Sequence, residues 1–355
     1  MVETWRLLDT GLASAARNVA LDRVLLEALD ADEITSTLRF VRFAPSALLA
    51  CRESALQAVD LSECASAKVA IQRRISGGAT WLVDERHLGW QLYLHRRDIG
   101  NTGMRDIAKR VGHAVATALA AFGIDARYRA PDEIEVDGRT LCWMAHAAEG
   151  RAVMLQGLIL TTVDLELATR IVRLPAVAAS EAALTAARRR IAGLTEVLGR
   201  AADLHRVRRN ITEAIESEFD VEFREGDLGL TENGRYARAF AEIDTADWVG
   251  LVGKPASDVR LVEAVRTVRG GVLRASARYE PATRAIRQVW FEGETGLSPP
   301  RALLDLEALL RDMPMERLAR AVASFFNSGA VKARNTEPAD FVAVVELAAD
   351  QPLTA

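Results

Sequence analysis

Two adjacent arginines followed by a serine and two glycines are the residues of this chain that could most readily do chemistry. Arg73 and Arg74 carry fixed positive charge, and the glycines of Ser76-Gly77-Gly78 let backbone amides come close to a ligand. Such a combination suits an anion, most simply a phosphate or a carboxylate. Double-glycine turns beside arginine are common, so the inference depends on what surrounds this arginine-glycine loop (residues 73–79).

Short strands are expected on either side of the loop. One apolar run starts at Val69 and leads into it, and another, residues 80–83, follows it. In residues 88–94, apolar side chains then alternate with Gly89, Gln91 and Tyr93, which is the period of a strand with one face on a core. We therefore expect the order strand, loop, strand, turn, strand.

Helices and further strands are expected before and after this segment. Residues 5–8 favour an edge strand, and apolar residues between 21 and 29 recur at the spacing of an amphipathic helix, as they do between 107 and 122. A meander of three strands is expected over residues 133–160, with a tight hairpin turn at Asp137-Gly138.

Composition and charge exclude several classes of protein. Half of the 355 residues are apolar, which is enough for a sizeable core, and the net charge of -4 argues against nucleic acid or a membrane surface as the partner. No apolar run approaches the length of a membrane span, and the first residues lack a secretory pattern, so a cytoplasmic protein is expected. The three cysteines and five histidines show no metal-ligand spacing, so no metal site is predicted.

The arginine-glycine loop resembles the motif of the lipoate protein ligase A family, in the superfamily of biotin and lipoate ligases and octanoyltransferases. The family pattern R-R-x-[ST]-G-G-G-A-V-x-H-D is matched at Arg73, Arg74, Ser76, Gly77, Gly78 and Asp84. Ala79 stands where the third glycine is expected, and Val83 where the histidine is. The meander resembles a second family pattern, at residues 132–134, 138–145 and 156–160.

The resemblance implies an α+β fold in two parts. Residues 1–250 would form the ligase-like domain, with mixed and antiparallel β-sheets flanked by helices. Residues 256–355 would form a small α+β accessory domain, after a linker at Gly253-Lys254-Pro255.

The resemblance also implies a reaction. Members of this family attach a lipoyl or octanoyl group to a lysine of a lipoyl carrier domain through an acyl adenylate, which requires ATP and magnesium. The positions expected to bind the acyl group and the nucleotide are Arg73, Arg74, Ser76, Gly77, Gly78, Ala79, Asp84, Asp132, Glu133, Trp143, Gln156 and Gly157.

The family pattern breaks at its catalytic residue. The lysine that would hold the carboxylate and the phosphate corresponds to Thr140, which carries no charge. Arg139 cannot simply replace it, because neighbouring residues on a strand point to opposite faces, and Lys68 would have to reach in from another direction. Trp143 replaces a glycine, Met144 a small residue and Gln156 a histidine, so the substitutions gather at the site of the acyl adenylate.

Three hypotheses remain open. The chain is an active ligase or acyltransferase with an altered site, or a catalytically inactive relative that binds a lipoyl carrier domain, an acyl group or a catalytic paralogue. In the third, Cys142 accepts an acyl group, since two residues from Thr140 it would share the same face of the strand. Separately, Arg188, Arg189 and Arg190, with Arg206, Arg208 and Arg209, make a basic surface that is either a solvated helix face or a docking patch for an acidic carrier.

Overall fold

The computed structural model describes residues 2–100, 102–173, 181–251, 259, 261–269, 271–293, 295–299, 302–327, 329 and 331–350. Contacts divide the chain into two compact units, Met1–Gly253 and Lys254–Ala355. The expected linker Gly253-Lys254-Pro255 lies outside the described residues. Each unit is described by itself. Within the described ranges, no helix is both long enough and apolar enough to cross a membrane.

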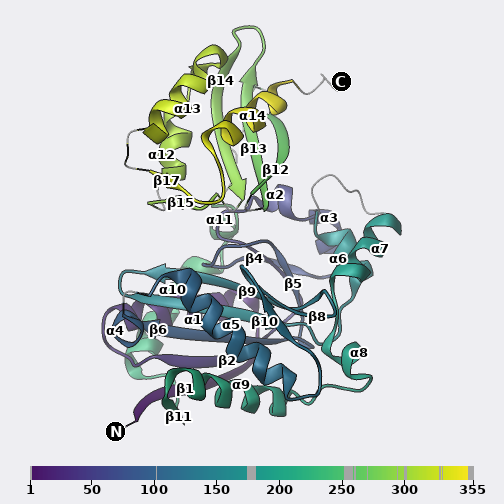
Figure 1. The fold of residues 1–355 in the computed structure, drawn as a ribbon, viewed down its shortest axis with the longest axis vertical. Coiled ribbons are helices and arrows are strands. Elements are labelled where there is room, and N and C mark those ends of the chain that lie inside the picture. The colour runs from purple at the N-terminus through teal and green to yellow at the C-terminus, as the bar shows by residue number, and fades with distance from the viewer. Residues whose placement is uncertain are drawn as a thin grey trace. The chain divides into compact units, whose positions relative to one another are not determined.

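An eight-stranded mixed sheet forms the centre of the first unit (Figure 1). Its strands run in the order β11-β1-β2-β6-β10-β9-β8-β7, with β1 parallel to both of its neighbours and the other pairs antiparallel. The bounds are β1 Glu3–Ala13, β2 Thr37–Phe43, β6 Leu88–His95, β7 Arg127–Arg129, β8 Glu133–Val136, β9 Arg139–Glu149, β10 Ala152–Ile159 and β11 Val221–Glu225.

The expectation that residues 5–8 form an edge strand is wrong. Strand β1 lies between β2 and β11, and β11 comes from a segment more than two hundred residues later in the chain. Trp5 is accordingly buried, with its ring against Phe219 and Phe223. The local pattern gave no sign of this parallel partner, because its residues are remote in sequence.

Helices cover one face of the large sheet, and helices together with a small sheet cover the other. Helices α5 (Met104–Ala120) and α9 (Leu204–Phe219) bury their apolar stripes on the first face, with Trp90 and Cys142 in that core. Helix α1 (Ala15–Asp30) packs on the opposite face and against α10 (Leu230–Ile243).

The small sheet carries the arginine-glycine loop on that second face. It has the order β4-β3-β5, with β3 Ser46–Leu49, β4 Ala70–Arg73 and β5 Trp81–Val83. The remaining helices of this unit are α2 Ala55–Ala58, α3 Leu61–Ser66, α4 Arg96–Ile99, α6 Leu165–Ile171, α7 Glu181–Arg190, α8 Leu194–Leu198 and α11 Ala246–Val249. The strand, loop, strand, turn, strand order expected around the loop is confirmed as β4, loop, β5, turn and β6.

The second unit is a smaller α+β body with its own core. A sheet of order β12-β13-β14-β16 packs against helices, and Phe291 of β14 meets Phe341 of α14 edge to face. A separate pair of short strands, β15 and β17, lies beside it. The bounds are β12 Leu261–Val268, β13 Gly271–Glu280, β14 Ala285–Gly293, β15 Leu297–Ser298, α12 Ala302–Leu309, β16 Met313–Pro314, η1 Met315–Arg317, α13 Leu318–Asn327, β17 Lys332–Ala333 and α14 Pro338–Ala349.

Candidate functional site

Arg73, the first residue of the arginine-glycine loop, is buried and holds main chain together. Its guanidinium donates hydrogen bonds to the carbonyls of residues 50, 51 and 53 and to those of Trp248 and Val249 at the end of the unit. The Trp248 indole donates back to the Arg73 carbonyl at 2.9 Å. The bonds of this guanidinium are therefore directed at backbone and fix the base of the loop.

Arg74 is equally buried and shapes the loop from below. It donates to the carbonyls of Leu48, Gly77 and Ala79, each at 2.7 Å, and to the Ser76 hydroxyl at 2.9 Å. Its guanidinium also stacks 4.3 Å from the centre of the Trp81 ring. Burial lowers the pKa of Arg74 to about 10, which still leaves the side chain charged at neutral pH.

Two backbone amides at the tip of the loop are unpaired within the described residues. Gly78 and Ala79 are exposed, and within the described ranges their N–H groups meet no acceptor. Gly78 has φ +96, and an added Cβ would lie 3.2 Å from the Arg74 Nη2 atom, so glycine is required there. The loop thus offers two backbone donors beside a buried cation, and this combination suits an anion.

Gln156 and Gly157 of β10 lie directly beneath the loop. The Gln156 side-chain amide donates to the Ser76 hydroxyl at 2.6 Å. Gly157 lines the space beneath the loop, and its other side meets the Trp90 indole in the core under α5 and α9, where an added Cβ would come within 2.4 Å of the ring. These contacts bring together five of the positions expected from the sequence: Arg74, Ser76, Gly77, Gln156 and Gly157.

Very little space remains beneath the loop. The cavity there measures about 10 Å³, and its wall combines small apolar side chains such as Val19 and Val41 with Asp22, Gln91 and Gln156. A cavity of this volume holds at most one water molecule. In this conformation the loop is closed over the site.

A buried polar network adjoins the cavity, and the sequence analysis did not anticipate it. Arg39 donates to Asp22 at 2.6 Å and to Gln91 at 2.8 Å, and Tyr93 donates to Asp22 at 3.2 Å. Burial raises the pKa of Asp22 to about 6 in spite of the Arg39 guanidinium. The available signal was a charged residue within each apolar run: Asp22 in the first helix and Arg39 in the second strand.

Thr140, at the position of the family lysine, belongs to a cluster with excess negative charge. Its hydroxyl accepts a hydrogen bond from the Arg129 Nη2 atom at 3.4 Å. Arg129 is also paired with Glu133 and, at 3.2 Å, with Glu135. Asp132 lies beside them, and its carbonyl accepts from the Met144 amide at 2.7 Å.

The inference that Cys142 shares a face with Thr140 is wrong, because a β-bulge separates them. Glu135 pairs with Thr140 but Ile134 pairs with Cys142, so Leu141 is an extra residue in β9. Leu141 and Cys142 both enter the core under α5 and α9. Cys142 is fully buried there, and burial raises the pKa of its thiol to about 12.

Trp143 remains on the site face, whereas Met144 does not. Trp143 pairs with Glu133 across the strands and is half-buried, while Met144 enters the opposite core and fills no space at the site. With Asp84, His87 and Ile191, Trp143 lines a cavity of about 230 Å³. Asp84 itself pairs with Arg86, and Lys68 is an exposed turn residue with φ 56 before β4.

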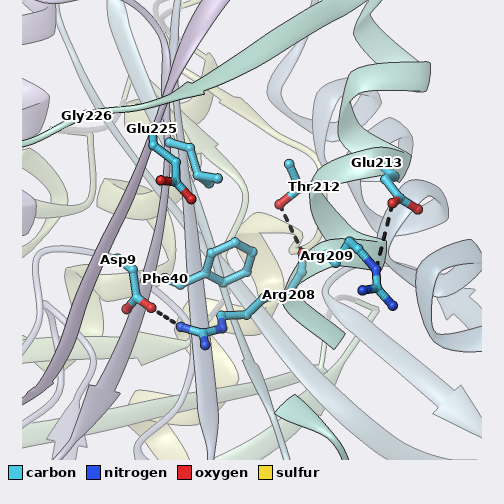
Figure 2. Close-up of a pocket in the computed structure, with 9 residues that line it drawn as sticks. Asp9, Phe40, Arg208, Arg209, Thr212, Glu213, Glu225 and Gly226 are labelled. Atoms are coloured by element: carbon cyan, nitrogen blue, oxygen red, sulfur yellow. Dashed lines mark hydrogen bonds and ion pairs between the residues drawn. The ribbon is translucent and has the colours of Figure 1, made fainter. Parts of the chain in front are cut away.

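A larger cavity lies on the other side of the sheet. It measures about 500 Å³ and opens between α9 and the strands β1, β2 and β11 (Figure 2). Arg208 pairs with Asp9 across it, and Arg209 approaches Glu213 at 3.9 Å, so both of these arginines have acidic partners. Leu7 and Phe40 in its wall pack with the core under α9, away from the arginine-glycine loop.

Comparison with known proteins agrees with the resemblance drawn from the loop and the meander. Octanoyltransferase LipM of Moorella thermoacetica is 27% identical over 267 residues, which cover 70% of this chain and 98% of that protein. Residues 14–216 match the lipoyl protein ligase A/B catalytic domain.

Solved structures agree in fold. The bipartite lipoate protein ligase of Thermoplasma acidophilum, studied with its E2 lipoyl domain, has a TM-score of 0.64 at 19% identity and covers 72% of this chain and 100% of that one. LipL1 of P. falciparum in complex with lipoate has a TM-score of 0.72 at 13% identity and covers 98% and 99%. At these identities the structures show the fold alone. Because the family match extends over more than half of its length, this chain belongs to the lipoyl protein ligase A/B catalytic domain family.

Proposed function

We propose that this chain does not form an acyl adenylate itself and that it binds a protein that carries, or will receive, a lipoyl or octanoyl group. The observation that supports this is the charge around Thr140. Where the family resemblance implies a lysine ammonium, one guanidinium, Arg129, is shared by two carboxylates, Glu133 and Glu135.

The negative charge around Thr140 disfavours the acyl-adenylate intermediate. The carboxylate of the acyl substrate and the phosphate of the nucleotide are both anions, and they gain stability only beside excess positive charge. Two unit charges about 4 Å apart interact by roughly 1 kcal/mol in water and roughly 4 kcal/mol near a protein surface. A cluster with one more carboxylate than guanidinium therefore repels what a lysine would attract.

The lack of space beneath the loop also supports the proposal that no acyl adenylate forms. An octanoyl or lipoyl chain is many times larger than the single water molecule that a cavity of about 10 Å³ can hold. Arg74 is held by three carbonyls and stacks on the Trp81 ring, so the chain could enter only if the loop were displaced.

An active ligase or acyltransferase is the second candidate. The free amides of Gly78 and Ala79 above the Arg74 guanidinium favour it, since they could receive a phosphate when the loop opens. A ligase would use ATP and magnesium to activate free lipoate or octanoate, whereas an acyltransferase would take the acyl group from a thioester donor and release the thiol. A catalytic paralogue could supply the missing lysine.

One pair of measurements separates the candidates. The chain is incubated with an apo lipoyl carrier domain and either ATP, magnesium and lipoate or octanoate, or an octanoyl thioester donor. Pyrophosphate release and carrier mass are followed, and binding to the same carrier is measured by calorimetry. We expect neither pyrophosphate nor acylated carrier, together with measurable binding. An active lipoate ligase acting on the same carrier is the positive control. Acylated carrier would establish the second candidate, and absence of binding would refute the first.

A further inference from the structure

Three consecutive arginines at the end of α7 form a positive surface. Arg188, Arg189 and Arg190 are exposed, and none of them has an ion-pair partner in the described part of the chain. Arginines on neighbouring segments do have such partners: Arg170 pairs with Glu63 and Arg173 with Asp60. We call these three residues the arginine patch.

The arginine patch leads directly into the candidate site. The next residue, Ile191, forms a β-bridge with Thr140, and the amide of Ala192 donates to the Thr140 carbonyl at 3.0 Å. Ile191 also lines the cavity of about 230 Å³ beside Trp143. A macromolecule bound at the patch would therefore lie within a few residues of the site.

From this placement we propose that Arg188, Arg189 and Arg190 form the docking surface for an acidic face of the carrier protein, an inference that rests on the proposed function. Charge complementarity identifies the occupant. Unpaired cations attract a surface rich in carboxylates, and they raise the rate of encounter most at low salt. A nucleic acid is the less favoured occupant, because three arginines make a small footprint on a chain whose net charge is -4.

The alternative to docking is a local role, in which the three arginines only stabilise the end of α7. Basic side chains in the last turn of a helix are favoured by the helix dipole, and α7 ends with all three. The helix dipole stabilises any basic side chain in that turn, and it does so whether or not a carrier protein is bound. Dependence of carrier binding on the sign of these charges is therefore the property that separates docking from helix capping.

The test uses the full chain and an acidic apo lipoyl carrier domain as the probe. Affinity is measured by calorimetry from low to physiological salt for the wild type and for the triple variant Arg188→Glu, Arg189→Glu, Arg190→Glu. We expect the variant to bind about tenfold more weakly or worse at low salt, and to lose most of the salt dependence. Replacement of all three by lysine keeps the charge and should leave the affinity within about threefold of the wild type.

A matched control has the same change of net charge at another surface. Arg105, Arg200 and Arg224 are exposed and have no ion-pair partner in the described residues, and all three belong to the first unit. Their replacement by glutamate should alter carrier affinity much less than replacement of the patch. Circular dichroism and thermal unfolding of each variant establish that it is folded.

The outcomes distinguish the two proposals. If the wild type binds the carrier and the patch variant binds equally well, the docking surface is wrong while the proposed function stands. If the control variant loses as much affinity as the patch variant, net charge and not docking is responsible, and the inference fails. If the wild type does not bind the carrier, both fail. Tighter binding to a single-stranded oligonucleotide than to the carrier would also overturn the inference.

Discussion

Arg129 donates a hydrogen bond to the hydroxyl of Thr140 at 3.4 Å, so a guanidinium reaches the place where the family resemblance implies a lysine. The guanidinium of Arg129 is already paired with two carboxylates, those of Glu133 and Glu135. Positive charge is present at the site, but it is already neutralised. Under the proposed function, the absence of adenylation is therefore a matter of charge balance as well as of one missing residue.

Restoring the lysine at position 140 alone should therefore not restore adenylation. In Thr140→Lys the new ammonium would be surrounded by Glu133 and Glu135, and the half-buried Trp143 would still occupy the same face. We expect pyrophosphate release to stay at background in the single variant and to rise at least about tenfold when Trp143→Gly is added. Turnover by Thr140→Lys alone would show that neither the carboxylates nor the indole impedes the reaction.

Cys142 should be inert towards thiol reagents in the folded protein. With a pKa of about 12, roughly one thiol in ten thousand is ionised at pH 8, and the side chain is fully buried. Mass spectrometry after brief treatment with iodoacetamide should find Cys142 unlabelled and the partly exposed Cys51 labelled first. All three cysteines should react in guanidinium chloride. Rapid native labelling of Cys142 would reopen the hypothesis that it accepts an acyl group.

The sequence predicted the strand order around the loop because short strands and their turns are encoded locally, by alternation and by glycine. It could not predict the bulge at Leu141, since one extra residue in β9 becomes visible only through the register with β8. That single residue moves Cys142 into the core. The roles of Arg73 and Arg74 were equally hidden, because they bind the carbonyls of Val249 and Leu48, which are distant in sequence.

Close packing against Trp90, in the core under α5 and α9, should make Gly157 intolerant of any side chain. An alanine Cβ there would lie 2.4 Å from the Trp90 ring, while one at Gly77 would meet nothing within 4 Å. Because a packed core resists added volume, Gly157→Ala should lower the free energy of unfolding by about 1–3 kcal/mol. Gly77→Ala, in the same site, should change it by no more than about 1 kcal/mol. Urea denaturation measures both, and equal stabilities would show that Trp90 moves aside freely.

Buried His87 should make stability depend on pH below neutrality. Its Nδ1 atom accepts the Thr161 amide at 3.2 Å, which requires that nitrogen to be unprotonated, and burial lowers the pKa of His87 although Asp84 opposes this. Between the lowered value and 6.5 the unfolded chain binds more protons than the native state, so stability is lost as pH falls through that window.

Replacement of His87 by asparagine removes the titration and keeps an acceptor in the side chain. The free energy of unfolding of the wild type relative to His87→Asn should therefore decrease from pH 7 to pH 5, by about 1.4 kcal/mol for each unit by which the pKa is lowered. Replacement of the exposed His205 by asparagine provides the control for loss of a histidine elsewhere in the same unit. Urea midpoints at each pH supply the comparison, and parallel curves for the wild type and His87→Asn would mean that His87 is protonated at no cost in the folded protein.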